Sequence, residues 1–224
     1  GHQNFTMFVQ NGRVANFPGY PLKSNLNRLA HVLKEDEAFR GTTFRLTCNG
    51  HLIIADVPNA GVPAMKALLA ELALNNLQYT SLRLHSMACV ALPTCGLAMA
   101  ESERYLPSLV TLLDKVIEEA GLRNDAIVIR MTGCPNGCAR PYNAEIALVG
   151  KALGAYNLYL GGAHNGGRLG KIYKESVNEE QIIEALTPLI KQYALERLDS
   201  EYFGDFVIRK GVVKATREGK DFHD

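Results

Sequence analysis

Four of the five cysteines fall into two short-range pairs whose spacing is typical of a metal site. Five residues separate Cys89 from Cys95, three separate Cys134 from Cys138, and 38 residues lie between the pairs. Thiolate sulfur is a soft, anionic ligand that binds iron strongly, and each iron of a [4Fe-4S] cluster takes one protein ligand. Because four cysteines complete that set, the spacing favours a [4Fe-4S] cluster.

Other interpretations of the cysteines remain open on spacing alone. Structural zinc also takes four cysteines, but its paired ligands usually stand two to four residues apart, so the five-residue gap counts against zinc. Disulfides are disfavoured because the cytosol is reducing. The fifth cysteine, Cys48, has no motif spacing, and we interpret it as an inert buried thiol within a strand.

The second cysteine loop has a composition suited to wrapping closely around a cofactor. Pro135 fixes one φ angle, whereas Gly133, Asn136 and Gly137 can adopt left-handed or crowded backbone conformations. We expect their amides to point at cluster sulfurs. Such hydrogen bonds stabilise the reduced cluster and raise its potential.

Length and charge describe an ordinary globular chain of one or two domains. The 224 residues are 47% hydrophobic, with 24 basic against 23 acidic side chains, so no overall charge favours nucleic acid or an anionic membrane. The apolar stretches are much shorter than the roughly 20 residues of a membrane span. The N-terminus also lacks a signal-peptide pattern. We therefore expect a cytoplasmic protein that binds neither nucleic acid nor membrane.

The elements that must position the cysteines begin with a domain over residues 1–75, for which the pattern predicts the order β-β-α-β-β-α. Asn11-Gly12 and Asn49-Gly50 are hairpin signals between alternating runs. The strands expected around them cover residues 5–9, 13–17, 44–48 and 51–57. Apolar residues at helical spacing predict one helix capped by Ser24 and a second over residues 63–74, with a proline in its first turn.

A second domain over residues 76–224 carries both cysteine loops. The expected helices cover residues 97–105, 107–120 and 178–197. The expected strands cover residues 126–131, 145–149 and 157–160, with a short β-like run at 205–209. Together the two domains predict an α+β protein.

The residues around the cysteines resemble a known family. SMACVALPTCGLAMAE at residues 86–101 and MTGCPNGC at residues 131–138 closely resemble the C-terminal half of assimilatory sulfite reductase hemoproteins, within the nitrite/sulfite reductase family. The resemblance extends from the hairpin at Phe5 to the tail at Phe206. It implies a ferredoxin-like half-domain over residues 1–75, followed by an α/β [4Fe-4S]- and sirohaem-binding domain.

The resemblance also implies roles for individual residues. The four paired cysteines would bind [4Fe-4S], and the sulfur of Cys138 would in addition bridge to the sirohaem iron, which makes it the catalytic candidate. The coupled cofactors would deliver six electrons to sulfite, giving sulfide. The residues that match family positions close to the sirohaem are Thr132, Gly133, Asn136 and Gly137.

Partners follow from the same resemblance: sulfite, a flavoprotein alpha component that donates electrons from NADPH, and an N-terminal half of the same protein. The family's Arg and Lys cluster for sulfite has no counterpart here, so we expect a fragment that does not turn over alone. A sirohaem nitrite reductase shares the cofactors and spacings, although residues 88–100 favour sulfite. A four-cysteine zinc or structural module is the other alternative.

Two further features receive ordinary interpretations. His85, four residues before Cys89, could be an axial ligand, but a solvated or hydrogen-bonded histidine is more common, and His164 is interpreted in the same way. The glycine-rich stretch over residues 161–171 lacks the hydroxyl residue that a P-loop needs after its lysine. It is interpreted as a loop near the sirohaem edge or a solvated turn, with Arg168 and Lys171 available to carboxylates.

Overall fold

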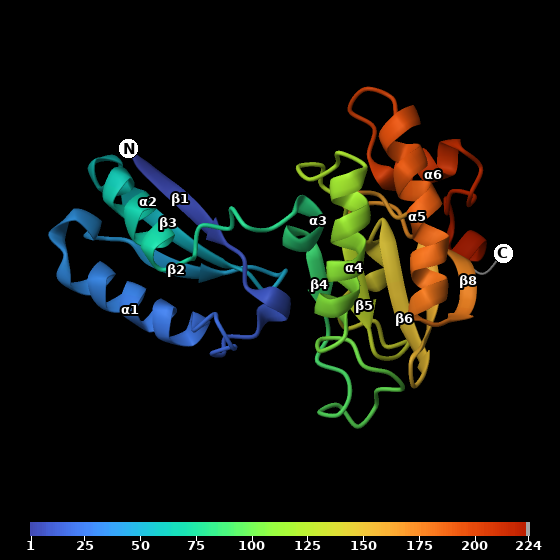
Figure 1. The fold of residues 1–224 in the computed structure, drawn as a ribbon, viewed down its shortest axis with the longest axis horizontal. Coiled ribbons are helices and arrows are strands. Elements are labelled where there is room, and N and C mark those ends of the chain that lie inside the picture. Colours follow the sequence, from blue (N-terminus) through green and yellow to red (C-terminus); the bar gives the residue numbers. More distant parts are fainter. Residues whose placement is uncertain (223–224) are drawn as a thin grey trace. The chain divides into compact units, whose positions relative to one another are not determined.

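The computed structural model describes residues 1–222, which fall into two compact units, Gly1–Tyr79 and a second that begins at Thr80 (Figure 1). Each unit has its own hydrophobic core. The boundary between Tyr79 and Thr80 lies a few residues after residue 75, where the sequence pattern predicts the end of the first domain. No helix in this described part of the chain is long and apolar enough to cross a membrane.

The first unit is a three-stranded antiparallel sheet with two α-helices. Its elements are β1 (His2–Met7), α1 (Leu22–Glu35), β2 (Thr43–Leu46), β3 (Leu52–Pro58) and α2 (Val62–Glu71), with 3-10 turns at Gln10–Gly12, Glu37–Phe39 and Asn59–Gly61. The strand order is β1-β3-β2. Fully buried Ile54 of the central strand packs in one core with Leu29 of α1 and Met65 of α2.

One predicted hairpin is confirmed and the other is wrong. Strands β2 and β3 pair across the turn at Gly50, whose φ of 80° is left-handed. Asn11 and Gly12 are also left-handed, but residues 13–17 form no strand, and β1 pairs with β3 instead. The order is therefore β-α-β-β-α.

The helices of this unit differ from the prediction at their ends. Ser24 does not cap α1, which begins at Leu22; the Asn16 side chain bonds the amide and the hydroxyl of Ser24, both at 3.0 Å. Helix α2 has a proline in its first turn, as predicted, but ends at Glu71. Ala73 follows with a φ of 53°, outside the helical region.

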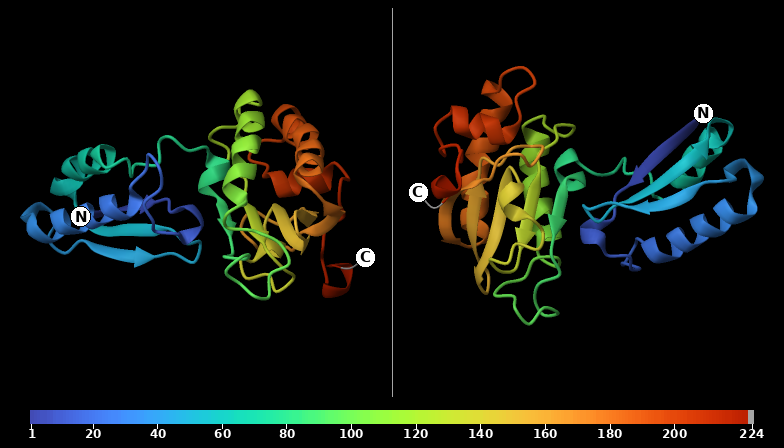
Figure 2. Two further views of the ribbon diagram at one scale, coloured as in Figure 1. Left: turned by 60° about the horizontal axis from the view of Figure 1, so that its bottom comes forward. Right: turned by 180° about the vertical axis from the view of Figure 1, so that it is seen from behind.

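The second unit is a five-stranded sheet covered by helices. Its elements are α3 (Ser81–Leu84), β4 (Ser86–Ala88), α4 (Leu106–Glu119), β5 (Ile129–Thr132), β6 (Ile146–Ala152), β7 (Ala155–Leu160), β8 (Lys171–Val177), α5 (Glu179–Glu196) and α6 (Phe203–Arg209), with 3-10 turns at Pro141–Asn143 and Gly219–Phe222. The strand order is β4-β5-β6-β7-β8; the first three are parallel, and β7 is antiparallel to both neighbours. Helices α4 and α5 lie side by side on the sheet (Figure 2).

Helices α4 and α5 agree with the sequence pattern, and three of the five strands overlap predicted ones, but four other segments differ from expectation. Residues 97–105 form a loop rather than a helix, and residues 205–209 belong to α6 rather than to a strand. In α6, Phe203, Phe206 and Val207 recur at helical spacing and are fully buried. The sequence pattern missed β4, which is three residues long, and β8, which is largely polar.

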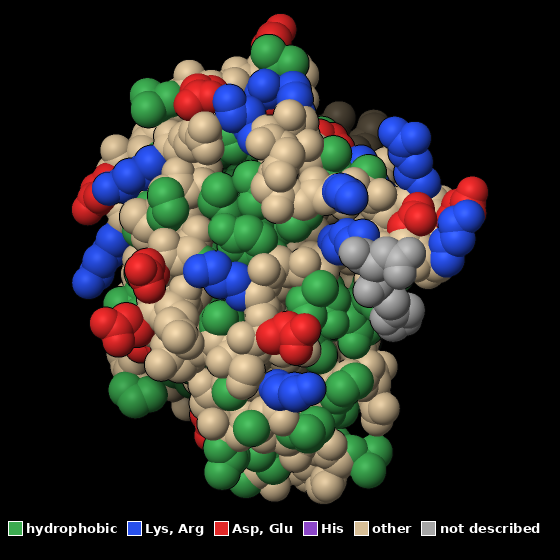
Figure 3. Space-filling model, turned by 90° about the vertical axis from the view of Figure 1, so that its right-hand side faces the viewer, with side chains coloured by type: hydrophobic (Ala, Val, Ile, Leu, Met, Phe, Trp, Pro, Cys, Tyr) green, Lys and Arg blue, Asp and Glu red, His purple; other side chains and the backbone are tan. Residues whose placement is uncertain are grey.

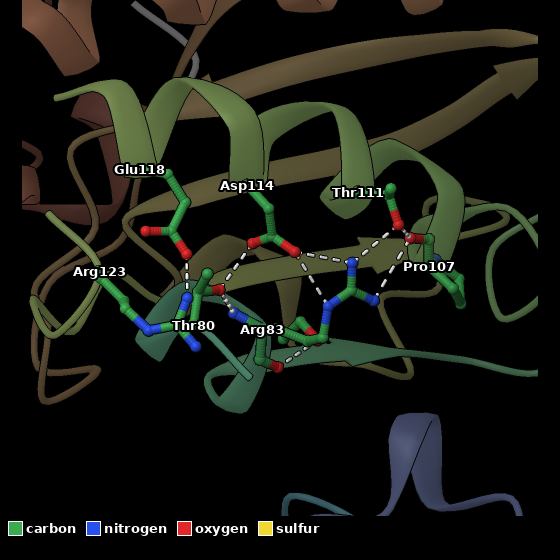
Figure 4. A network of polar contacts seen from close by, with 8 residues as sticks. Thr80, Arg83, Pro107, Thr111, Asp114, Glu118 and Arg123 are labelled. Atoms are coloured by element: carbon green, nitrogen blue, oxygen red, sulfur yellow. Dashed lines mark hydrogen bonds and ion pairs between the residues drawn. The ribbon is translucent and has the colours of Figure 1, made fainter. Parts of the chain in front are cut away.

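A polar network fixes the start of β4 against α4 (Figure 4). Nε and Nη2 of Arg83 in α3 donate to the Asp114 carboxylate at 3.0 and 2.8 Å, and the Thr80 hydroxyl donates to its other oxygen at 2.6 Å. Arg83 also donates to the Thr111 hydroxyl. Both ionic side chains are largely buried, so the pair is less screened than a surface ion pair.

Charges on the face drawn in Figure 3 are mixed. Lys and Arg side chains there are interspersed with Asp and Glu, and hydrophobic side chains lie between them. This face therefore carries no concentrated patch of one sign, in agreement with the balanced composition.

Candidate functional site

Both cysteine loops leave the sheet at the same edge. Cys89 directly follows β4, and Cys134 lies two residues beyond the end of β5. These strands are parallel neighbours with Ala88 opposite Met131, so their carboxyl ends meet. In open α/β sheets ligands bind outside the carboxyl ends of the strands. We call this end of the sheet the carboxyl edge.

Backbone hydrogen bonds join the two loops. The Cys89 amide donates to the Met131 carbonyl at 3.2 Å, as an extension of the β4–β5 pairing. Beyond Cys95, the amides of Met99 and Ala100 donate to the Gly133 carbonyl at 2.8 and 3.0 Å. These two bonds replace the intrahelical bonds expected for residues 97–105, so this segment packs on the second cysteine loop.

Glycine is required where the loops meet. A Cβ at Gly133 would lie 2.5 Å from the Ala91 Cβ and 2.7 Å from the Ala100 carbonyl oxygen. At Gly150 in β6 a Cβ would collide with the Gly133 carbonyl and lie 2.9 Å from the Ala100 Cβ. The sequence singled out Gly133 but missed Gly150. A glycine inside a strand pattern was the available signal, since it marks close approach of another backbone.

One cysteine sulfur already has polar neighbours. The Gly133 amide donates to Sγ of Cys89 at 3.3 Å, and Oγ1 of fully buried Thr132 lies 3.4 Å from the same sulfur. The backbone amide of this loop therefore points at a candidate ligand sulfur. Hydrogen bonds to a thiolate stabilise its negative charge and tune a bound cluster.

The four thiols differ in exposure. Cys134 is buried, Cys89 and Cys95 are half-buried, and Cys138 is exposed. A sulfur that stays exposed after its loop has packed is available to a second group. Of the neighbouring residues expected to meet a cofactor, Asn136 is also exposed.

The Tyr142 side chain forms a hydrogen bond with the backbone of the second cysteine loop. Its hydroxyl donates to the Pro135 carbonyl at 3.2 Å. Burial raises the pKa of Tyr142, and Tyr159 and Cys134 raise it further, so the hydroxyl remains a donor at neutral pH. Gly137 nearby has a φ of 68°, a conformation that glycine adopts without strain. The loop thus has the turn that its composition predicts.

The thiols do not converge on one point. Across residues 1–222, no three His, Cys, Asp or Glu side chains gather closely enough to hold a metal ion. A [4Fe-4S] cluster binds each cysteine through a different iron, so its ligands surround the cluster rather than one ion. Four thiols on two joined loops, with an amide directed at one sulfur, fit such a cluster by the chemistry of the donor set.

Comparison with known proteins finds named relatives. No protein-family model matches the chain. It is 53% identical, over its whole length, to the protein named sulfite reductase [NADPH] hemoprotein beta-component of Geobacillus kaustophilus. The whole chain thus matches part of a protein named as a sulfite reductase hemoprotein. It is also 50% identical, again over its whole length, to sulfite reductase [NADPH] subunit beta of Saccharomyces cerevisiae. It spans 38% of the former protein and 15% of the latter.

Solved structures show the same fold. The structure of Mycobacterium tuberculosis NirA protein matches all of the chain with a TM-score of 0.74 and 24% identity, over 40% of that protein. Dissimilatory sulfite reductase I matches 98% of the chain with a TM-score of 0.66 and 10% identity, over 70% of that protein. The predicted fold class, α+β of the nitrite/sulfite reductase type, is confirmed.

Two other predictions from the sequence are wrong. Cys48 is exposed on the turn after β2 rather than buried in a strand. The loop over residues 161–170 leaves β7 beside the start of β6, at the end of the sheet opposite the cysteine loops. There Arg168 meets a carboxylate, donating to Asp205 at 2.6 Å, while Lys171 is buried in β8.

Proposed function

We propose that the chain is the cofactor-binding part of an assimilatory sulfite reductase, whose reaction is the six-electron reduction of sulfite to sulfide. The joining of the two cysteine loops at the carboxyl edge carries the proposal, because these two loops contain the four thiols of the motif. Identities of 50–53% to proteins named sulfite reductase support it. Since the chain spans 38% of such a relative, the basic residues for sulfite belong to the remainder of the protein.

The cluster ligands in this proposal are Cys89, Cys95, Cys134 and Cys138. A single zinc ion would need all four sulfurs about 2.3 Å from one point. The five-residue gap between Cys89 and Cys95 is longer than the usual spacing of paired zinc ligands, which favours a cluster of several irons. The Gly133 amide then serves a liganding sulfur rather than a free thiol.

Cys138 is proposed as the bridge to sirohaem, which makes it the catalytic residue. Its exposure supports this role, because the sulfur must reach a second cofactor after its loop has packed. When bound, the coupled cofactors supply the electrons for sulfite reduction. Thr132 and Gly133 fix the neighbouring Cys89 sulfur, while Asn136 and Gly137 shape the loop that presents Cys138.

Apolar side chains around the loops support a second cofactor or protein surface at this place. Val90, Leu97 and Met99 lie in or beside the first cysteine loop and are 39%, 72% and 45% exposed. Clustered exposed apolar groups mark interaction sites. We propose that the sirohaem macrocycle and the remainder of the protein cover them.

The proposed electron donor is a flavoprotein component that takes electrons from NADPH, which agrees with the NADPH in the relatives' names. We propose a cytoplasmic location. The cysteines are all free thiols, as expected in a reducing compartment.

The cluster is tested by metal analysis of the chain purified without oxygen. We expect iron and acid-labile sulfide in equal amounts, near four of each per chain, with broad visible absorption. Cys134→Ser should lose most of this iron. The matched control is Cys48→Ser, which removes an exposed thiol outside the motif and should retain it. A colourless chain with stoichiometric zinc would contradict the proposal.

The substrate is tested in the whole protein with methyl viologen as electron donor. We expect reduction of sulfite in preference to nitrite, and a loss of at least about 100-fold in sulfite turnover in Cys138→Ser, because the substituted hydroxyl cannot act as a bridging thiolate. A strong preference for nitrite would instead identify a sirohaem nitrite reductase.

A further inference from the structure

A second polar centre lies at the opposite end of the sheet, where β4, β5 and β6 begin; we call this end the amino edge. Glu145 immediately precedes β6, and its side chain is fully buried. The carboxylate accepts hydrogen bonds from the amides of Val128 at 2.8 Å and Gly204 at 2.9 Å. It also accepts one from Nδ1 of His164 at 3.0 Å. A buried carboxylate with three donors is fixed in place.

His164 is held in orientation by its neighbours. Its ring stacks on Tyr202, with centroids 4.0 Å apart and planes 5° from parallel. Glu145 fixes one edge of the ring, and 21% of the side chain remains exposed to solvent. The hydrogen bond to Glu145 raises the pKa of His164. One ring is therefore rigidly placed with access to solvent.

A second imidazole stands beside it. His85 immediately precedes β4, is exposed, and has its ring centroid 6.0 Å from that of His164. Its Nδ1 lies 2.7 Å from the Ser81 carbonyl oxygen and 3.4 Å from the Ser81 hydroxyl. The two histidines come from loops 79 positions apart in sequence, and the sheet brings them together.

The hydrogen bonds determine which ring nitrogen is available. Carbonyl and carboxylate oxygens only accept, so Nδ1 carries the proton in both neutral rings and Nε2 carries the lone pair. A metal-binding histidine characteristically donates its other ring N–H to a carboxylate or a backbone carbonyl. Glu145 provides the first of these partners for His164, and Ser81 provides the second for His85.

The spacing also fits a shared ion. Imidazoles bound to one tetrahedral ion through nitrogens about 2.1 Å away place their ring centres roughly 5–6 Å apart. We propose that His85 and His164 bind one divalent transition ion of the zinc class through Nε2, with water completing its coordination. Imidazole suits zinc, so this site would hold a single ion, separate from the iron-sulfur cluster proposed for the four thiols at the carboxyl edge.

The surroundings admit a cation. The basic side chain Arg168 pairs with Asp205 at 2.6 Å, which offsets its charge. Asp205 also contributes to the raised pKa of His164, so its negative field reaches this ring. A purely structural role for His164 would account for its bonds to Glu145 and Tyr202, but it would not account for a second imidazole at ligand spacing.

The test follows the imidazole nitrogens of the 224-residue chain, labelled with ¹⁵N-histidine, by NMR during a titration with zinc chloride. We expect the Nε2 signals of His85 and His164 to shift together with one apparent affinity, while those of exposed His31 on α1 stay in place. Independent shifts of the two rings, or none, would overturn the proposal.

Variants at His85 and Cys134 determine whether the two imidazoles share the ion. His85→Gln alters an exposed side chain and should weaken the zinc effect at His164 at least about tenfold, whereas the matched control His31→Gln should leave it unchanged. Cys134→Ser should lose iron yet keep the coupled histidine shifts, so the failure of one proposal is distinguishable from the failure of the other. Loss of the histidine shifts in Cys134→Ser would mean that zinc acts through the cysteines, which also overturns the inference.

Discussion

The two edges of the five-stranded sheet use the same backbone device for different chemistry. At the carboxyl edge Gly150 admits the Gly133 carbonyl, and at the amino edge a Cβ on Gly204 would collide with the Gly162 carbonyl. The carboxyl edge leaves a thiol, Cys138, exposed. At the amino edge the Glu145 carboxylate is fully buried and bonded by three donors. The carboxyl edge thus leaves a cysteine sulfur accessible, whereas at the amino edge a buried carboxylate joins three segments and orients His164.

The largest expected loss of stability comes from a substitution at the amino edge. Glu145→Leu leaves the amides of Val128 and Gly204 without their acceptor in a buried place, and each such loss costs about 1–3 kcal/mol. We expect the free energy of unfolding of the second unit to fall by about 3 kcal/mol or more, measured by urea denaturation followed by circular dichroism.

The matched control is Glu184→Leu on the exposed side of α5, for which we expect a change within about 0.5 kcal/mol. Equal changes in the free energy of unfolding from Glu145→Leu and Glu184→Leu would show that the buried carboxylate stabilises the fold no more than an exposed one does. Iron bound per folded chain should stay unchanged in the Glu145 variant, since the cysteines lie at the other edge.

The next largest expected effect comes from a substitution at the carboxyl edge. Gly150→Ala drives a methyl group into the Gly133 carbonyl, and such overpacking typically costs about 1–3 kcal/mol. Because that carbonyl also binds Met99 and Ala100, the two cysteine loops should separate and iron content should fall at least about fivefold. Iron analysis together with thermal unfolding measures both effects.

Gly96→Ala is the control within the first loop, because a Cβ there meets no atom within 4 Å. We expect it to keep both iron and stability. If Gly96→Ala lost as much iron as Gly150→Ala, the cause would be a general sensitivity of the loop rather than close backbone approach.

Local sequence signals predicted the features that depend on neighbouring residues. The cysteine spacing and the glycines around Cys134 singled out the two loops that the structure joins at the carboxyl edge, and the hairpin predicted from Asn49-Gly50 is confirmed. The partner of β1 was wrong because it comes from residues 52–58, far from the local turn at Asn11.

Long-range contacts account for the remaining errors. Residues 97–105 have helical character, but Met99 and Ala100 bond to Gly133, which is distant in sequence. The amino edge escaped prediction for the same reason: Glu145 and His164 are 19 positions apart, one just before β6 and the other in the loop after β7. Only the packed sheet brings these residues together, so the pattern could identify the thiols but not the buried carboxylate.

The smallest effect sharpens the comparison within the carboxyl edge itself. Asn178 follows Val177, the last residue of β8, which lies opposite Tyr156 near the start of β7. Because β7 runs antiparallel to the strands that carry the cysteine loops, Asn178 lies at the carboxyl edge, several strands away from the cysteines. Its side chain accepts from the Gln181 amide, and the Gln181 side chain accepts from the Asn178 amide, both at 3.0 Å. This capping box starts α5.

Asn178→Ala should therefore lower the free energy of unfolding by about 1 kcal/mol, the usual contribution of an N-cap, while Asn178→Asp keeps an acceptor and should cost much less. Iron content should be unchanged in both variants, because the cap touches neither cysteine loop. Iron loss in Asn178→Ala would mean that the whole carboxyl edge responds as one unit. Retention of iron would confine cofactor binding to the ends of β4 and β5, where Gly133 joins the loops.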